Sequence, residues 1–245
     1  MMGLFSNIIS FVFPPRCPCC NEINHNGLPC DECAVELKKC ENLKNACRYC
    51  GLDKSCCQCS KYHYLFEGVA SPFKNKGVAQ EGVYGMKYHS MFHAARYFGV
   101  KLAECFAERF KNVNIDFVCI VPTHKSRLRK ISYDYVELLA KTVAHKLGLP
   151  FRPKTLKKIK VTESQHLLPI DKRQANVKGA FLCKDDLHGK TILLIDDIKT
   201  TGYTLNECSK QLRMCGAEKV YCATALITEY KKSLKEKNIE SVITF

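Results

Sequence analysis

The sequence predicts an α/β protein, in which a mostly parallel β-sheet is covered by helices on both faces and follows a small cysteine-rich module. Two observations predict this fold class. Apolar strand-like runs alternate with helix-like segments from residue 91 onward, and eleven of the 17 cysteines fall between residues 17 and 59. A chain of 245 residues is long enough for one sizeable core with a small satellite. We therefore expect a module over residues 1–60 and a larger domain over residues 61–245.

The elements of the larger domain can be assigned from their hydrophobic patterns. Three continuous apolar runs are expected to form buried strands, and three segments with apolar residues at helical spacing are expected to form helices. The clearest helix places Val136, Leu139 and Val143 on one face and should stop at Gly148. Strands that alternate with helices indicate a parallel sheet with both faces covered. The strands are expected over residues 116–122, 190–196 and 219–227, and the helices over residues 91–111, 133–148 and 204–216.

The cysteines of the first 60 residues include four C-x-x-C pairs. Two such pairs separated by a short loop suit tetrahedral zinc, because each pair occupies two corners of the site. We expect two structural zinc ions, one bound by the first and second pairs and one by the third and fourth. A cross-braced order, redox dithiols and an iron–sulfur centre are the alternatives. A short helix is expected over residues 34–45, and Cys19, Cys40 and Cys57 are alternate ligands. The expected ligands are Cys17, Cys20, Cys30, Cys33, Cys47, Cys50, Cys56 and Cys59.

The charge of the chain narrows the class of partner. With 38 Lys and Arg against 24 Asp and Glu, the net charge is +14, which favours nucleic acid, phosphorylated metabolites or anionic lipid. The first 60 residues hold six basic and six acidic side chains, so the excess lies in the larger domain. Its basic stretch over residues 151–181 is either a binding surface or a solvated loop. Because the sequence has no secretory signal and no apolar run of about 18 residues, we expect a reducing, cytoplasmic location.

The stretch ILLIDDIKTTGYTL, residues 192–205, contains the strongest candidate site. Adjacent carboxylates repel each other and are costly to bury, so Asp196 and Asp197 at the end of a buried strand indicate a polar ligand. The residues that follow offer hydroxyls and N–H groups at the start of a helix, which is an arrangement that holds phosphate. Together they indicate a sugar phosphate with magnesium, and an ordinary capped turn is the alternative. The expected phosphate-binding residues are Lys199, Thr200, Thr201, Gly202 and Thr204.

Part of this stretch resembles a known motif. LLIDDIKTTGYT resembles the phosphoribosyl pyrophosphate (PRPP) loop of type I phosphoribosyltransferases. Together with VPTHKSRLRKISYDYVELLA, TESQHLLPIDKRQANVKGAF and the four cysteine pairs, it makes the chain resemble the ComF competence family over nearly its whole length. The resemblance implies a type I phosphoribosyltransferase-like fold behind a zinc-binding module. It also implies PRPP and magnesium as ligands, and the handling of single-stranded DNA during natural transformation.

The resemblance assigns roles to individual residues. Asp196 and Asp197 would contact the ribose diol and magnesium and would be the catalytic residues, with pyrophosphate leaving C1′ through an oxocarbenium-like state. Thr200 stands where enzymes for 6-oxopurines carry an aspartate, so that class of acceptor is not expected, and residues 131–135 depart from the usual ComF pattern. The 5′-phosphate cradle would be Thr200, Thr201, Gly202 and Thr204, and the pyrophosphate loop Thr123, His124, Lys125 and Arg127.

Three functions from different classes fit these observations. The first is a PRPP-binding protein that handles single-stranded DNA. The alternatives are an active phosphoribosyltransferase that acts on an unidentified acceptor, and an adaptor, stabilised by zinc, that binds a competence helicase or an inner-membrane DNA channel. Basic segments without acidic residues would form the DNA groove, and Tyr133, Tyr135 and Phe151 would stack bases. The expected DNA contacts are Lys125, Arg127, Arg129, Lys130, Lys157, Lys158, Lys160 and Arg173.

Overall fold

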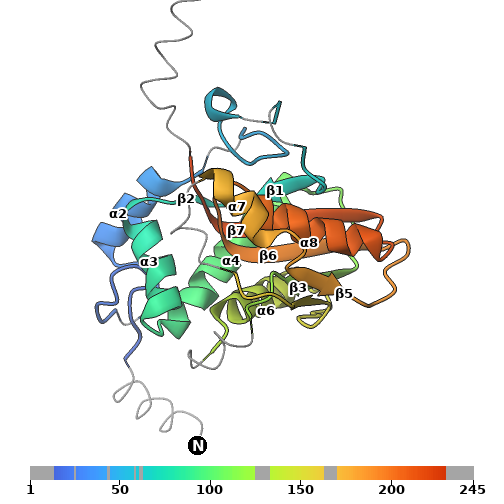
Figure 1. Ribbon diagram of the computed structural model, residues 1–245. Helices are drawn as coiled ribbons and strands as arrows, with labels where there is room; N and C mark the ends of the chain where they lie inside the picture. Colours follow the sequence, from blue (N-terminus) through green and yellow to red (C-terminus); the bar gives the residue numbers. More distant parts are fainter. Residues whose placement is uncertain are drawn as a thin grey trace, which may run out of the picture.

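A five-stranded parallel sheet lies at the centre of the protein (Figure 1). The computed structural model describes residues 14–24, 26–42, 45–57, 59–60, 63–124, 133–162 and 170–229, and only the backbone of residues 170 and 171. The strand order is β1, β7, β6, β3, and β2 pairs with the carboxyl end of β7. The expected fold class is therefore confirmed. The strands are β1 (Gly68–Ala70), β2 (Phe73–Lys74), β3 (Phe117–Ile120), β6 (Thr191–Lys199) and β7 (Lys219–Ile227).

Helices cover both faces of the sheet, because successive side chains of each strand point to opposite sides. Ile195 of β6 belongs to one apolar cluster with Phe98 of α4 and residues of α3 and α6. Leu194, its neighbour, belongs to a second cluster with Leu205 of α8. None of the helices in the described part of the chain is long and apolar enough to cross a membrane. The helices are α3 (Gly77–Tyr88), α4 (Phe92–Arg109), α6 (Tyr135–Leu147), α7 (Ile170–Val177) and α8 (Tyr203–Met214).

Helix α6 shows how the local sequence sets the ends of an element. The side chain of Asp134 accepts hydrogen bonds from the N–H groups of Val136, at 3.0 Å, and Glu137, at 3.2 Å, which satisfies donors of the first turn. Gly148 ends the helix with a φ of 66°, a left-handed conformation that favours glycine. The three helices and three strands expected in the larger domain are all confirmed.

An antiparallel ribbon lies beside the sheet and was not predicted. Strand β4 (Leu156–Lys158) pairs with β5 (Phe181–Cys183), and β5 contacts α8. Leu156 and Phe181 are buried, whereas Lys157 is exposed. In the sequence this region stands out only as a basic segment, because a three-residue strand is too short to show a clear period.

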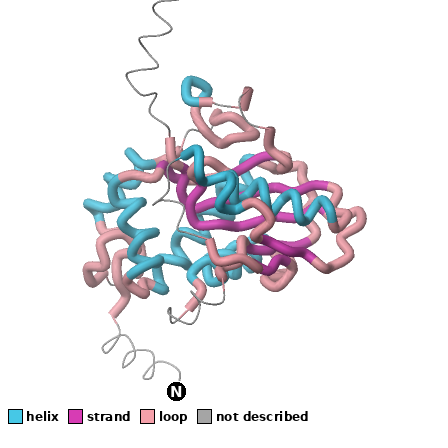
Figure 2. Tube along the Cα trace, viewed as in Figure 1, coloured by secondary structure: helices cyan, strands magenta, loops and turns pink. Residues whose placement is uncertain are grey.

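The two halves of the cysteine-rich segment pack at different edges of the larger domain (Figure 2). Helix α2 (Asp31–Cys40) contacts α3, and its Leu37 lies in the same apolar cluster as Phe98. The second half contains the short 3₁₀ turn η1 (Lys54–Cys56) and approaches β1, where the N–H of Val69 donates to the carbonyl of Arg48 at 3.0 Å. The expected short helix is thus present as α2, and it begins a few residues earlier than predicted. Both halves rest on the larger domain.

Candidate functional site

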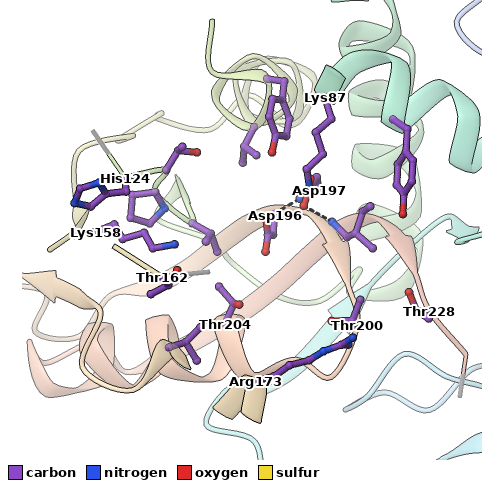
Figure 3. Close-up of a pocket in the computed structure, with 18 of the residues that line it drawn as sticks. Lys87, His124, Lys158, Thr162, Arg173, Asp196, Asp197, Thr200, Thr204 and Thr228 are labelled. Atoms are coloured by element: carbon purple, nitrogen blue, oxygen red, sulfur yellow. Dashed lines mark hydrogen bonds and ion pairs between the residues drawn. The ribbon is translucent and has the colours of Figure 1, made fainter. Parts of the chain in front are cut away.

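A cavity of about 520 Å³ opens where the parallel strands end. Its walls come from the carboxyl ends of β3 and β6, the start of α8, the last turns of α3 and the ribbon. Asp196 and Asp197 of β6 line it, and so do Thr200 and Thr204 from the loop and helix that follow (Figure 3). The cavity lies at the position where parallel α/β sheets bind ligands.

The two adjacent aspartates lie in different electrostatic environments. Lys87 of α3 donates to Asp197, with 2.8 Å between Nζ and Oδ2, and both side chains are largely buried. Burial tends to raise the pKa of Asp197, but the charge and hydrogen bond of Lys87 hold it below its usual value. For Asp196, burial and the negative charge of Asp197 raise the pKa well above the usual value. The pair therefore combines one firmly ionised carboxylate with one that retains its proton to higher pH.

Lys87 is a site residue that the sequence analysis missed. Burial tends to lower the pKa of this lysine, but the charge of Asp197 raises it above its usual value, so the ammonium stays charged. Its Nζ lies 5.9 Å from the ring centre of Tyr88 and 5.7 Å from that of Tyr135, and Tyr84 also lines the cavity. A lysine in the last turn of a helix has no distinctive spacing, so no motif in the sequence marks it.

The loop between β6 and α8 has the form of an anion-binding turn. Gly202 caps α8 with a φ of 84°, and a Cβ added there would lie 3.2 Å from Cε of Lys199. Thr201 is buried, and its hydroxyl accepts a hydrogen bond from the N–H of Tyr203 at 3.4 Å. Thr200 and Thr204 line the cavity. The first N–H groups of α8 and two hydroxyls therefore lie at one end of the cavity, where they can bind a phosphate.

The remaining polar residues of the predicted site divide into three sets. Thr123 and His124 line the cavity, as expected for the loop after β3. Lys158 and Arg173, which we expected to contact nucleic acid, line the same cavity. The exposed residues outside it are Lys157 and Lys160, and the residues that lie outside the described part of the chain are Lys125, Arg127, Arg129 and Lys130.

Lys199 does not occupy its expected position. Its side chain does not line the cavity and is only 2 % exposed, with Nζ lying 5.7 Å from the ring centre of Tyr64. The strand was expected to end at Asp196, whereas β6 continues to Lys199, which pairs with Ile227 of β7. Lys199 is thus a strand residue with an inward side chain, and not a loop residue facing the ligand site.

The aromatic residues expected to stack bases are mostly engaged within the protein. Tyr135 is 5 % exposed, and Tyr133 donates its hydroxyl to the carbonyl of Met86 and packs on Phe92, with ring centres 4.2 Å apart. Phe151 packs against the main apolar cluster. Packing of this kind is the common fate of aromatic side chains. Tyr135 is the one of these three that lines the cavity.

Two groups of four cysteines lie close enough to bind metal ions. In each group the four Sγ atoms all lie within 4.8 Å of one another. Burial tends to raise the pKa of Cys17, but hydrogen bonds from backbone N–H groups, including those of Cys19 and Cys30 at 3.4 Å, lower it to about 7. Similar bonds lower the pKa of Cys47 to about 7 against the effect of burial. Four thiolates at this spacing form a closed donor set that fits tetrahedral zinc. The groups are Cys17, Cys20, Cys30 and Cys33, and Cys47, Cys50, Cys57 and Cys59.

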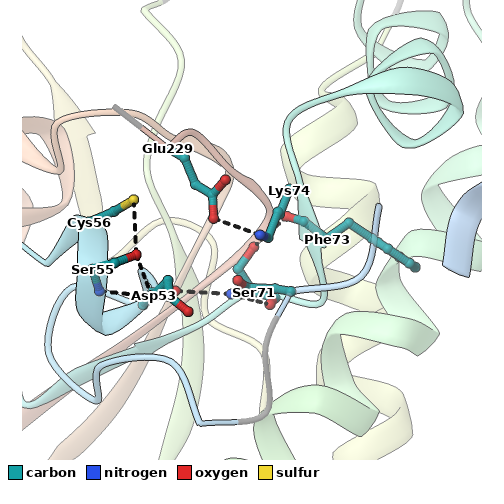
Figure 4. A network of polar contacts seen from close by, with 9 residues as sticks. Asp53, Ser55, Cys56, Ser71, Phe73, Lys74 and Glu229 are labelled. Carbon is teal, nitrogen blue, oxygen red and sulfur yellow. Dashed lines mark hydrogen bonds and ion pairs between the residues drawn. The ribbon is translucent and has the colours of Figure 1, made fainter. Parts of the chain in front are cut away.

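The second group corrects one expected ligand, because Cys57 replaces Cys56. Cys56 is the last residue of η1, whose turn is capped by Asp53 through hydrogen bonds from the N–H and hydroxyl of Ser55, at 2.8 and 2.6 Å (Figure 4). In this turn the Sγ of Cys56 lies 3.7 Å from the Ser55 hydroxyl, while the Sγ of Cys57 lies 3.6 Å from that of Cys50. Each group combines pairs that are neighbours in sequence, so the order is sequential and not cross-braced.

Comparison with known families agrees with the form of the cavity. The profile of the phosphoribosyl transferase domain family matches residues 101–244. The chain belongs to the phosphoribosyltransferase family. The matched range contains β3, β6 and α8, and with them Asp196 and Asp197, but it begins after Lys87. The cavity of this phosphoribosyltransferase domain is therefore completed by side chains of α3 from outside the matched range.

Curated relatives match a part of this chain. Competence protein F of Haemophilus influenzae is 34% identical over 103 residues, which are 41% of this chain and 45% of the relative. DNA utilization protein YhgH of Salmonella typhi is 30% identical over 105 residues, 43% of this chain and 46% of the relative. The ribose-phosphate pyrophosphokinase of Pyrococcus furiosus is 37% identical over 84 residues, 34% of this chain and 25% of the relative. The matches span just under half the length of the first two relatives, and they confirm the resemblance to the ComF family.

Proposed function

We propose that this phosphoribosyltransferase domain binds PRPP with magnesium and handles single-stranded DNA during DNA uptake. The proposal that PRPP binds here rests on one observation: an acidic pair, a helix N-terminus with hydroxyls, and several basic side chains line a single cavity. PRPP has a ribose diol, a 5′-phosphate and a pyrophosphate, which are chemically complementary to these three features in turn.

The arrangement of charges favours one orientation of the ligand. The 5′-phosphate would bind at the N-terminus of α8, and the diol would donate to Asp196 and Asp197. In Figure 3, His124 and Lys158 lie across the cavity from Thr200, so the pyrophosphate would extend toward them. Lys87 would exchange part of its contact with Asp197 for a phosphate oxygen.

The donor set of the cavity also fits magnesium. Magnesium prefers oxygen ligands and is commonly bound through one or two carboxylates together with substrate phosphates. Asp196 and Asp197 would supply the carboxylates, and a bound magnesium ion would neutralise charge on the acidic pair and on the pyrophosphate. The raised pKa of Asp196 supports this role, because the carboxylate is costly to ionise without a cation.

The relatives and the surface lysines support the DNA-handling part of the proposal. Two relatives are named for competence and DNA utilization. Lys157 lies on the ribbon that flanks the cavity and Lys160 follows β4, and both are exposed to solvent, where they would neutralise phosphates of a single strand. The same proposal includes a structural zinc ion in each cysteine group.

Calorimetry with PRPP tests the ligand assignment. The purified zinc-loaded protein is expected to bind PRPP in the presence of magnesium, and Asp196→Asn together with Asp197→Asn should weaken binding at least about tenfold, because charge-assisted hydrogen bonds contribute about 1.5–3 kcal/mol each. Unchanged affinity in a folded double variant would remove the acidic pair from the site.

A second candidate is turnover of PRPP, with an acceptor displacing pyrophosphate from C1′. Tyr84, Tyr88 and Tyr135 line the cavity near Lys87, and aromatic rings favour a planar acceptor. Release of pyrophosphate from PRPP, measured with a panel of nucleobases, distinguishes the two candidates. Pyrophosphate release that depends on one base favours the enzyme, and binding without release favours the DNA-handling protein.

A further inference from the structure

Lys199 is a buried lysine at the end of β6. It is 2 % exposed, and among the described residues no carboxylate lies within ion-pair distance of its ammonium group. Burial lowers its pKa, and the groups that oppose this effect are thiols, with Cys50 and Cys59 the largest contributors. A buried lysine is normally paired, because an isolated charge is costly to remove from water. The thiols of the second cysteine group, when ionised, would supply its counter-charge.

The second cysteine group packs against the end of the central sheet that carries Lys199. Cys50 is buried in one cluster with Leu52 and Ile227, and Tyr64 packs against the same cluster. Ile227 is the partner of Lys199 in the pairing of β7 with β6. The ammonium of Lys199 lies over the ring of Tyr64, at 5.7 Å. The lysine and the thiols thus share one small interior region.

A second basic residue reaches the same cysteine group from α4. Arg109 donates from one terminal nitrogen to the carbonyls of Ala46 and Cys47, both at 2.7 Å. Its Nε is buried and has no hydrogen-bond partner among the described residues. Burial lowers the pKa of this guanidinium, and Cys105, Cys47 and Cys50 oppose that effect when they are ionised. The group is therefore flanked by a lysine from β6 and an arginine from α4.

The charge of a loaded site explains this arrangement. Four thiolates around one divalent zinc ion carry a net charge of −2, whereas four protonated thiols carry none. A buried lysine and a half-buried arginine beside a loaded site form a neutral assembly, and the same cations beside unloaded thiols lack a counter-charge. The first cysteine group has a different setting, since it packs on α3 and α4, where His93 Nε2 lies 3.3 Å from the carbonyl oxygen of Cys17.

We propose that Lys199 and Arg109 are the counter-ions of the metal-loaded second cysteine group, and that Lys199 links this metal site to the phosphate-binding loop. The link to a ligand rests on the proposed function, while the counter-ion role does not. Lys199 precedes Thr200 in the chain, its carbonyl accepts from the N–H of Thr228 at 2.9 Å, and its Cε lies against Gly202. A change in the position of this side chain would therefore move the loop that caps α8.

Metal retention in full-length variants tests the counter-ion role. Lys199→Met keeps the length and the apolar part of the side chain but removes its charge, Lys199→Arg keeps the charge, and Lys219→Met removes an exposed lysine at the opposite end of β7. Zinc release to a chelator and ¹¹³Cd NMR of the cadmium-loaded protein would be measured for each. Lys199→Met should weaken metal binding at one of the two sites by about 10- to 100-fold and shift one of the two cadmium signals. Lys199→Arg should restore most of the loss, and Lys219→Met should match the wild type.

Two outcomes would overturn the inference separately from the proposed function. Wild-type metal release in Lys199→Met, or equal effects at both sites, would remove the counter-ion role whether or not PRPP binds. If Lys199→Met does not fold, Arg109→Met gives the same readout, and it too should weaken one site only. Where the wild type binds PRPP, Lys199→Met should bind it more weakly. Unchanged PRPP affinity together with accelerated zinc release would overturn the link to the loop and leave the counter-ion role.

Discussion

The ion pair between Lys87 and Asp197 gives the sharpest prediction for stability. Lys87→Met removes the charge and leaves a side chain of similar length. Because Asp197 is then a buried carboxylate next to a second one, the variant should be strongly destabilised. Asp197→Asn should also destabilise, since it leaves the buried ammonium of Lys87 without its partner.

The magnitude follows from the burial of the pair. The side chains of Lys87 and Asp197 are 13 % and 9 % exposed, so the pair belongs with buried salt bridges. Breaking such a pair by removing one partner costs about 3–5 kcal/mol, whereas removing both partners is often nearly neutral. Lys87→Met combined with Asp197→Asn should therefore lose clearly less stability than the sum of the two single losses.

Urea unfolding of the zinc-loaded protein, without PRPP or magnesium, would be measured for the wild type, the two single variants and the double variant. Lys111→Met is a suitable control, because Lys111 is an exposed lysine after the end of α4. Unfolding of Lys87→Met at the same urea concentration as the wild type would show that the ion pair does not stabilise the fold. Additive single losses in the double variant would likewise show that the two charges do not interact.

Three further predictions concern single features. Asp196→Asn should raise the free energy of unfolding at neutral pH in the ligand-free protein, because the raised pKa of Asp196 makes its ionised form costly in the folded state. This gain should shrink as the pH falls toward about 3.9, the pKa of an aspartate in an unfolded chain, because the group is then protonated in both states. A gain in the free energy of unfolding by urea that does not change with pH would contradict this explanation. By metal analysis, Cys57→Ser should lose one zinc ion while Cys56→Ser keeps both, and the reverse result would restore Cys56 as the ligand. Lys157→Ala with Lys160→Ala should weaken single-stranded DNA binding and flatten its salt dependence by about 0.7 per lost phosphate contact, while PRPP affinity stays unchanged. Wild-type affinity and salt slope in fluorescence anisotropy would exclude these lysines from the DNA surface.

Long, continuously buried elements of this fold could be predicted, whereas short or glycine-rich ones could not. β6 and β7 are nine residues each and show clear apolar runs. Helix α3 was not predicted, because it contains three glycines and glycine is a poor helix former. Two of these glycines are nevertheless needed for packing. A Cβ on Gly82 would lie 2.5 Å from the carbonyl oxygen of Pro18, and one on Gly85 would lie 2.0 Å from the sulfur of Met91. Close approach between elements is a tertiary property that a periodic pattern does not reveal.

The same distinction applies to the site. Asp196, Asp197, Thr200 and Thr204 lie close together in sequence and form a motif, so their placement around one cavity could be predicted. Lys87 reaches Asp197 across 110 positions of the chain, a contact that only the fold creates. Cys56 and Cys57 offer equivalent thiols, and the local turn at Asp53 decides between them. In the sequence, Lys158 and Arg173 cannot be distinguished from surface charges. In the fold, Lys158 of the ribbon and Arg173 of α7 line the cavity.

A crystal structure of the protein soaked with PRPP and manganese, in place of magnesium, would locate both proposed ligands. Anomalous scattering would locate the metal ion, and the ligand density would give the position of the 5′-phosphate. We expect manganese beside Asp196 and Asp197 and the 5′-phosphate at the N-terminus of α8, next to Thr200 and Gly202. PRPP and manganese bound elsewhere on the protein, with this cavity holding only solvent, would contradict it.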